Sequence, residues 1–221
     1  MARCWPTCSC TFMCCFYVYY SAIFFFGIFS FITWLIFLPQ ELKFAVTDAS
    51  LTQFEYNSTA NNTLLYNMAL NITIRNSNKR VGVYYNRIQA ISQYGKKRFS
   101  MVTLTNSTPF YQGRKNTTII SAVIQGQQVL LFKDKELKKY NTETNAGVYS
   151  IEVRLALRVK ARYGKLKTRY YKPQEKVSCK LKLPLLVNNS INGTASIANS
   201  IKFKATWCGN VYVLTTKNDG G

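Results

Sequence analysis

The sequence predicts an all-β fold, a two-sheet antiparallel β-sandwich, preceded by a single N-terminal transmembrane helix. Two observations carry this prediction. An apolar run without charge occupies residues 16–38 of the 221-residue chain. After it, apolar and polar side chains alternate with a period of two along many short segments separated by turn residues. Many short strands at regular spacing favour two packed antiparallel sheets.

The apolar run from Phe16 to Leu38 contains neither a charge nor a proline, and three tyrosines and a tryptophan lie near its ends. About 20 such residues, at about 1.5 Å of rise each, cross the roughly 30 Å of hydrocarbon in a bilayer. Aromatic rings with a polar tip prefer the headgroup layer. A cleaved signal peptide would have a shorter apolar region followed by small residues, whereas this run ends at Leu38-Pro39-Gln40. We therefore expect an uncleaved membrane anchor.

All Asn-x-Ser/Thr sequons of the chain follow the apolar run, and none precedes it. Glycans are added to such sites in the lumen, so the chain from about residue 40 onward is expected to be lumenal or extracellular. The N-terminus is then cytosolic, although the charge bias between the two flanks is weak. The candidate glycosylation sites are Asn57, Asn61, Asn71, Asn106, Asn116, Asn188 and Asn192.

The predicted cytosolic tail, residues 1–15, is rich in cysteine. Cytosolic thiols stay reduced, and the tail is too short to fold around a zinc ion, so neither a disulfide knot nor a metal site is expected. Cysteines beside a membrane helix are typical sites of palmitoylation. The alternative is that they serve as small apolar residues at the bilayer edge. The candidate acylation sites are Cys4, Cys8, Cys10, Cys14 and Cys15.

Two cysteines follow the anchor, Cys179 and Cys208, and an oxidising compartment allows them to form one bridge. The alternation places Cys179 among inward-facing residues, whereas Cys208 is out of step with its apolar neighbours Phe203 and Trp207. A β-bulge at Cys208-Gly209 would repair the pattern. A disulfide and two separate buried thiols both remain open.

The alternating segments predict one β-sandwich domain at residues 51–214, with a juxtamembrane linker at 39–50 and a polar tail at 215–221. A turn is expected at Gln125–Gln127, and a short helix or a loop at Lys133–Tyr140. The expected strands are 66–74, 81–91, 98–104, 117–124, 129–132, 148–163, 176–183, 201–207 and 211–214.

Basic side chains recur on one side of several predicted strands and apolar ones on the other. If these strands lie in one sheet, its solvent face is strongly positive. The alternative is a solvated face that discourages edge-to-edge aggregation. That alternative explains why the side chains are polar, but not why they are positively charged, since acidic side chains would serve equally well. The formal net charge of +20 points to an anionic partner or environment. The expected basic face comprises Arg154, Arg158, Lys160, Arg162, Lys180, Lys182, Lys202 and Lys204.

Catalytic chemistry is poorly represented in the sequence. The chain has no histidine and only nine acidic residues, which excludes histidine triads and most catalytic zinc sites. It has no Asp-x-Asp pair for a metal-bound sugar nucleotide and no glycine-rich phosphate loop. We expect no enzyme and no catalytic, cofactor-binding or metal site, with a Golgi lumenal enzyme as a distant alternative. A lumenal domain also disfavours nucleic acid as a partner.

Residues 75–118 contain the runs RNSNKRVGVYY and TPFYQGRKNTT. With Asn76-Ser77-Asn78, Tyr84-Tyr85, Pro109–Gly113 and Asn116–Thr118 they resemble the harpin-induced-like, or non-race-specific disease resistance-like, family of plant proteins. The extracytoplasmic part of that family is a late-embryogenesis-abundant group-two domain. Ser77 stands where the family usually has proline, which makes this turn less rigid.

The resemblance implies a fibronectin- or immunoglobulin-like β-sandwich on a plasma-membrane anchor, and a role in plant defence or stress responses without catalysis. Together with the basic face, it predicts an interaction module for acidic cell-wall polysaccharide or for a partner ectodomain. A β-sandwich that binds lipid or contacts anionic membranes is the alternative. Within Pro109–Gly113 we expect Phe110 in the core, an unusual φ at Gly113, and a structural role for Tyr111 in preference to a binding role.

Overall fold

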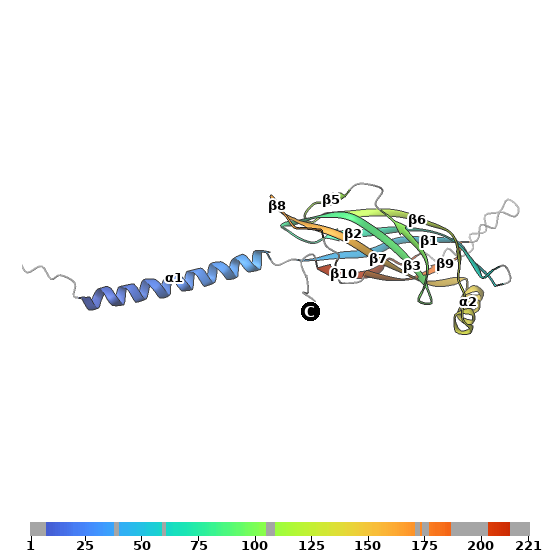
Figure 1. The fold of residues 1–221 in the computed structure, drawn as a ribbon, viewed down its shortest axis with the longest axis horizontal. Coiled ribbons are helices and arrows are strands. Elements are labelled where there is room, and N and C mark those ends of the chain that lie inside the picture. Colours follow the sequence, from blue (N-terminus) through green and yellow to red (C-terminus); the bar gives the residue numbers. More distant parts are fainter. Residues whose placement is uncertain are drawn as a thin grey trace, which may run out of the picture. The chain divides into compact units, whose positions relative to one another are not determined.

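The computed structural model describes residues 8–37, 40–58, 61–104, 109–170, 173, 177–186 and 203–212. The chain divides into two compact units, Met1–Leu38 and Pro39–Gly221. The first contains one long helix, α1, and the second is built mainly of antiparallel strands (Figure 1). The predicted all-β sandwich after an N-terminal apolar helix is therefore confirmed.

Helix α1 spans Cys8–Phe37, and its segment Met13–Leu35 is long and apolar enough to cross a membrane. None of that segment is buried inside the protein. A helix that is apolar on all sides and uncovered by protein is typical of a membrane span. The helix begins earlier than the predicted residue 16, so half of the expected tail is helical.

The β domain consists of two antiparallel sheets. One has the strand order β10-β1-β2-β6. In the other, β3 and β7 pair with each other, β3 also pairs with β4 and β5, and β7 also pairs with β8 and β9. The strands are β1 (Glu41–Asn57), β2 (Thr63–Asn76), β3 (Val81–Tyr94), β4 (Lys97–Thr103), β5 (Phe110–Gln112), β6 (Thr117–Val129), β7 (Val148–Tyr163), β8 (Leu166–Lys167), β9 (Val177–Pro184) and β10 (Thr206–Tyr212).

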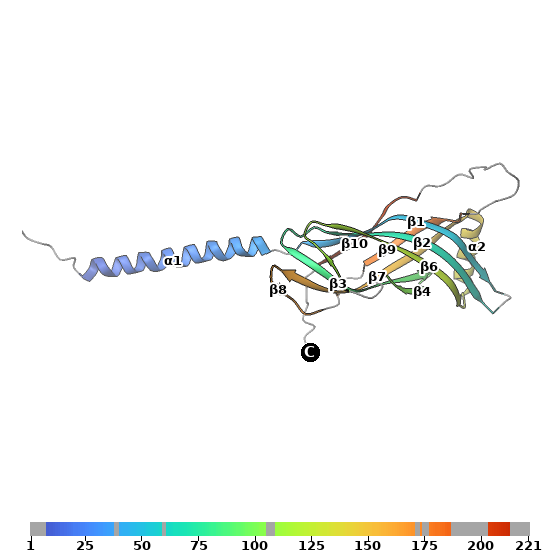
Figure 2. The same ribbon diagram turned by 90° about the horizontal axis from the view of Figure 1, so that it is seen from above.

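The core lies between the two sheets, which both contribute alternate side chains to one buried cluster. In β2 the buried residues follow the predicted period, and in β7 every second residue from Tyr149 to Ala161 is buried. Helix α2 (Asp134–Ala146) lies at one end of this sandwich and β8 at the other (Figure 2). The core fixes which side chains of β7 face outward.

The first half of β1 corrects the prediction of a linker at residues 39–50. Leu42, Phe44 and Val46 are buried in the core, and β1 pairs with both β2 and β10. Irregularities in the pairing with β2 lie between Val46 and Asp48 and between Leu51 and Gln53. Each one shifts the inward positions, so no long alternation is visible in the sequence.

Strand β6 runs through Gln125–Gln127, where a turn was expected. Gly126 pairs with Tyr66 of β2, and a Cβ atom on Gly126 would lie 3.0 Å from the Tyr66 hydroxyl. The glycine allows this close approach of an aromatic ring, and it does not mark a chain reversal. The predicted turn and the separate strand at 129–132 are both wrong.

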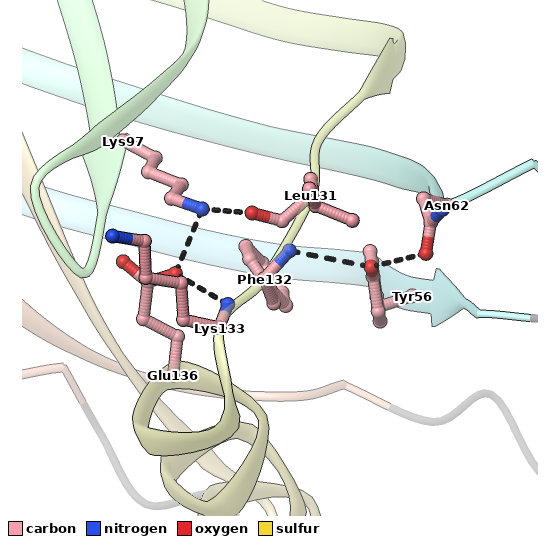
Figure 3. A network of polar contacts seen from close by, with 7 residues as sticks. All are labelled: Tyr56, Asn62, Lys97, Leu131, Phe132, Lys133 and Glu136. Carbon is pink, nitrogen blue, oxygen red and sulfur yellow. Dashed lines mark hydrogen bonds and ion pairs between the residues drawn. The ribbon is translucent and has the colours of Figure 1, made fainter.

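Helix α2 is longer than the predicted 133–140 and is tied to the sandwich by polar contacts (Figure 3). The Lys133 backbone N–H donates to Glu136 Oε2 at 3.0 Å, and Lys97 Nζ lies 2.9 Å from the same oxygen. Lys97 also donates to the Leu131 carbonyl. Tyr56 donates to Asn62 at 2.9 Å and accepts from the Phe132 N–H at 3.4 Å. These bonds fix the loop that leads into α2.

Cys179 of β9 and Cys208 of β10 are joined by a disulfide, with their Cα atoms 4.2 Å apart. The bond links the two sheets. The β1–β10 register shifts between Phe44 and Ala45, opposite Cys208, so the expected bulge is present. Strand β10 nevertheless begins at Thr206, and Trp207 is 64% exposed while Cys208 is buried. Of the strand predicted at 201–207, residues 201 and 202 lie outside the described residues, residues 203–205 are not in a strand, and Trp207 faces outward, contrary to the prediction.

Candidate functional site

The basic side chains of β7 and β9 lie on one face, because the two strands are neighbours in one sheet. We define the basic face as the outward residues Arg154, Arg158, Lys160, Arg162, Lys180 and Lys182. Lys204 does not belong to it, since it precedes β10, which pairs in the other sheet. Lys202 lies outside the described residues. The prediction of one basic surface from all these segments is wrong for Lys204.

One acidic residue, Glu152, interrupts the basic face. Its carboxylate accepts from Arg154 Nε at 2.8 Å and from the Ser178 hydroxyl at 2.6 Å. The hydrogen bond from Arg154, followed by that from Ser178, holds the pKa of Glu152 below its usual value. Arg154 is therefore neutralised, and the charge of the face is carried by its other cations.

Tyrosine rings accompany the cations at the β8 end of the face. Lys160 Nζ lies 5.1 Å from the centre of the Tyr170 ring, and Arg158 lies 5.9 Å from it. Arg162 lies 5.6 Å from the centre of the Tyr111 ring. Such cation–π contacts hold a charged head over an aromatic face without neutralising it. The cations are thereby positioned and still carry their charge.

A pocket of about 220 Å³ opens at this end of the face, and we call it the arginine pocket. Residues from the start of β3, from β5 and the turn after it, and from the β7–β8 turn meet here. The lining residues are Arg80, Gly82, Tyr111, Arg114, Arg162 and Gly164. Arg162 Nε donates to the Gly164 carbonyl at 2.8 Å, and its Nη1 donates to the Tyr84 hydroxyl at 3.2 Å. These two bonds fix the Arg162 guanidinium.

Tyr111 forms a wall of the arginine pocket because Gly82 lets its ring approach the backbone of β3. A Cβ atom at Gly82 would lie 2.2 Å from the Tyr111 hydroxyl and 2.6 Å from the ring. The ring also packs against Tyr84, with centroids 4.6 Å apart, and remains 44% exposed. Any other residue at position 82 would displace Tyr111.

A buried polar network supports the arginine pocket from below. Gln112 donates to the Ile74 carbonyl at 2.8 Å and accepts from the Tyr85 hydroxyl at 2.9 Å. Asn76 donates to the carbonyls of Val81 and Gly113 at 2.9 and 3.0 Å. Buried amides with such partners define one conformation of their loops.

The motif segments Asn76–Asn78, Tyr84-Tyr85 and Pro109–Gly113 are therefore brought together at one place. Phe110 is half-buried and stacks on Tyr85, with centroids 4.7 Å apart. Gly113 has no positive φ, contrary to the prediction, whereas Lys115 has a φ of 50°. Tyr111 packs against Tyr84 and over Gly82 and is partly exposed, so the preference for a structural role over a binding role stays a prediction.

A second hollow, of about 370 Å³, lies at the α2 end of the same face. It gathers Lys96 from the β3–β4 turn, Lys139 from α2, and Lys180 and Lys182 from β9. Lys139 is already paired with Glu143 at 3.6 Å and lies 4.7 Å from the centre of the Tyr94 ring. Burial, followed by the hydrogen bond to Glu143, raises the pKa of Tyr94. With these lysines at the α2 end and the arginines at the β8 end, cations occupy both ends of the face.

The remaining predicted sites are dispersed. Asn57, Asn61 and Asn116 are exposed, whereas Asn71 lies on β2 and accepts a hydrogen bond from Ser121 at 2.8 Å. Sites outside the described residues are Asn106, Asn188, Asn192 and Cys4. Cys14 and Cys15 are exposed free thiols on α1. Cys8 and Cys10 also lie in α1.

Arg80, Arg114 and Tyr84 were not among the site residues predicted from the sequence. Arg80 and Tyr84 come from one segment and Arg114 from another, and only the fold brings them beside Arg162. The available signal was local: two of them flank the motif segments, and Tyr84 belongs to one. Alternation along β7 could reveal the basic face, but it carried no information on the pocket at its end.

Comparison with known proteins gives close relatives but no matching family model. The chain is 46% identical over 178 residues to NDR1/HIN1-like protein 10 of Arabidopsis thaliana, covering 80% of this chain and 76% of that protein. It is 44% identical over 164 residues to NDR1/HIN1-like protein 3 of the same plant, covering 74% and 68%. A solved protein from Archaeoglobus fulgidus aligns with a TM-score of 0.31 and 8% identity, over 64% of this chain and 98% of that one.

Proposed function

Because the chain belongs to the NDR1/HIN1-like protein family, we propose that it is a plant defence or stress protein of the plasma membrane. Its N-terminus is cytosolic, and its β domain is extracellular. There the basic face binds acidic cell-wall polysaccharide and catalyses no reaction. The sequons after the membrane helix support the orientation, and the relatives from a plant support a cell-wall polymer as the anion.

The observation that carries this proposal is the set of cations without acidic partners along β7 and β9. Among the described residues, the ion pairs involve Lys97, Lys139 and Arg154. The remaining cations of the basic face, Arg158, Lys160, Arg162, Lys180 and Lys182, therefore keep their charge for a partner. One exposed contact contributes only about 0.2–1 kcal/mol, so the partner must touch several of them together. An extended polyanion does so.

The proposal includes no catalytic step. It is supported by the composition of the face, which consists mainly of cations and phenols, and by Glu152, whose carboxylate is held by Arg154 and Ser178. The face is suited to binding through charge.

The first test measures binding of long polygalacturonate to the full chain in nanodiscs of neutral phosphatidylcholine. We expect affinity to fall steeply as salt is raised, because the contacts are exposed charges. The triple variant Arg158→Ser, Lys160→Ser, Arg162→Ser should bind about tenfold more weakly at low salt, from the loss of three such contacts. A matched control, Lys135→Ser, Lys138→Ser, Lys204→Ser, removes the same charge from exposed positions outside the face.

An equal loss of affinity in the two triple variants would show that net charge alone attracts the polymer, and would overturn the proposal. The same measurement with vesicles containing anionic lipid is a further arm. If the wild-type chain prefers those vesicles to polygalacturonate, the face contacts membranes and the proposed ligand is wrong.

A further inference from the structure

We propose that the arginine pocket binds the carboxylate-bearing ring of a single uronate residue. This inference rests on the proposed function, because it names the sugar unit that the protein would recognise within an acidic polymer. It concerns a different set of side chains, however. Of the pocket residues, only Arg162 also belongs to the basic face.

Three guanidinium groups line a pocket in which no acidic residue takes part. The ion pairs among the described residues use none of Arg80, Arg114 and Arg162. A guanidinium is planar and offers paired N–H donors that match the two oxygens of a carboxylate. The pocket therefore presents donors for an anionic ligand, and the chain supplies no carboxylate to fill it among the described residues.

The Tyr111 ring adds an apolar wall beside these donors. It stands over Gly82 and against Tyr84, it lines the pocket, and it is 44% exposed. Ligand sites generally combine aromatic surface with a few placed polar groups. A sugar ring has C–H groups that pack on such a surface, whereas inorganic phosphate has none. The combination of arginines and a tyrosine wall thus favours a carboxylate carried on a ring.

The pocket is held in shape before any ligand arrives. The turn that carries Arg114 is fastened by the Lys115 N–H to the Asn78 carbonyl at 3.1 Å, and by the Asn76 N–H to the Asn116 carbonyl at 2.9 Å. Arg162 is fixed by Gly164 and Tyr84. Groups that are already ordered lose less conformational freedom on binding, which leaves more of the interaction energy for affinity.

The size and position of the pocket suit one ring of a longer chain. Its volume of about 220 Å³ is below the roughly 300–1,000 Å³ of pockets that enclose drug-sized ligands. The neighbouring outward residues of β7 are Lys160 and Arg158, so further acidic units would meet the rest of the basic face. The pocket selects a unit, and the face holds the polymer.

The test compares trigalacturonate, its methyl ester and inorganic phosphate by calorimetry, with the full chain in neutral nanodiscs. We expect trigalacturonate to bind and the uncharged ester to bind at least about tenfold more weakly, because charge-assisted hydrogen bonds are lost. Arg80→Gln with Arg114→Gln should weaken trigalacturonate binding by about tenfold or more. The control Lys79→Gln with Lys165→Gln removes the same charge beside the pocket without altering its lining.

A second variant, Gly82→Ala, leaves the charge unchanged and displaces Tyr111 from the wall. It should weaken trigalacturonate binding while the far-ultraviolet circular dichroism of the domain stays as in the wild type. If Gly82→Ala unfolds the domain, the test of the pocket rests on the variant Arg80→Gln with Arg114→Gln. Both of these side chains are exposed, so their replacement should leave the fold intact.

Three outcomes would overturn the uronate site: equal binding of the methyl ester, competition by phosphate at equal concentration, or an equal loss in the lysine control. If long polygalacturonate still binds through Arg158 and Lys160 in those cases, the proposed function stands without the pocket. If trigalacturonate binds as expected but the long polymer does not, the pocket stands and the proposed function falls.

Discussion

Glu152 determines how much of the charge on β7 is available to a ligand. Its carboxylate pairs with Arg154, which is then not available to a ligand, and also accepts a hydrogen bond from Ser178 of the neighbouring strand. It lies opposite Lys180 in the β7–β9 register, so it lowers the local positive potential as well. A single carboxylate in this position reduces repulsion among the cations and limits affinity for anions.

Replacing Glu152 with Gln should strengthen polygalacturonate binding at low salt by about threefold to tenfold, because Arg154 becomes available and one repulsive charge is removed. Binding to the full chain in neutral nanodiscs measures this change. Glu55→Gln, on an exposed position of the other sheet, is the charge-matched control and should have a much smaller effect. No gain in affinity over that control would contradict the role of Glu152.

The same variant should be less stable by about 1 kcal/mol at neutral pH, since Glu152 loses charge-assisted bonds. The folded-state pKa of Glu152 is lowered from 4.5, mainly by Arg154 and next by Ser178. Its contribution to stability is therefore present above that ordinary value and is lost as the pH falls through the lowered pKa. Thermal melts of wild type and variant should differ at pH 7 and converge as the pH falls below the lowered pKa of Glu152.

At the scale of elements, regular strands could be predicted and irregular ones could not. In β2 and β7 the inward side chains follow an unbroken period of two, so both strands and the basic face were visible in the sequence. In β1 and β10, bulges shift the period, and the sequence then suggests a linker or the wrong inward residue. The arginine pocket depends on contacts between distant segments, which periodicity does not encode.

The disulfide between Cys179 of β9 and Cys208 of β10 is a covalent cross-link between the two sheets. Cys179 and Cys208 are separated by 29 residues. Closing a loop of that length lowers the conformational entropy of the unfolded chain, which stabilises the folded state by about 3–4 kcal/mol. Cys179→Ser with Cys208→Ser should lower the free energy of unfolding by this amount, as measured by denaturant titration of the full chain. Cys14→Ser with Cys15→Ser, on α1, should leave it unchanged.

Adding a reductant tests the Cys179–Cys208 disulfide independently of the substitutions. Reducing the wild-type chain should lower its unfolding midpoint to that of the Cys179→Ser, Cys208→Ser variant. A wild-type midpoint that is insensitive to reductant would show that the two thiols are not bonded in the protein.

At the scale of the whole molecule, the proposed orientation predicts which sequons carry glycans. Asn57, Asn61 and Asn116 are exposed, whereas Asn71 is half-buried in β2, between β1 and β6, and bonded to Ser121. In plant membranes, endoglycosidase should increase the gel mobility of the protein. Asn57→Gln, Asn61→Gln or Asn116→Gln should reduce that shift, and Asn71→Gln should not.

Protease added to intact protoplasts should remove the β domain and spare an epitope placed at the N-terminus. A β domain that is protected from protease and insensitive to endoglycosidase would place it in the cytosol. The proposed ligand would then be excluded together with the orientation.

The link from Cys179 to Cys208 also changes what a break in the backbone would do. Between these two residues the chain is a closed ring and not a line. A peptidase that hydrolysed one peptide bond within that ring would separate no fragment, because β10 would stay attached through sulfur. A nicked molecule would therefore keep both α1 and β10.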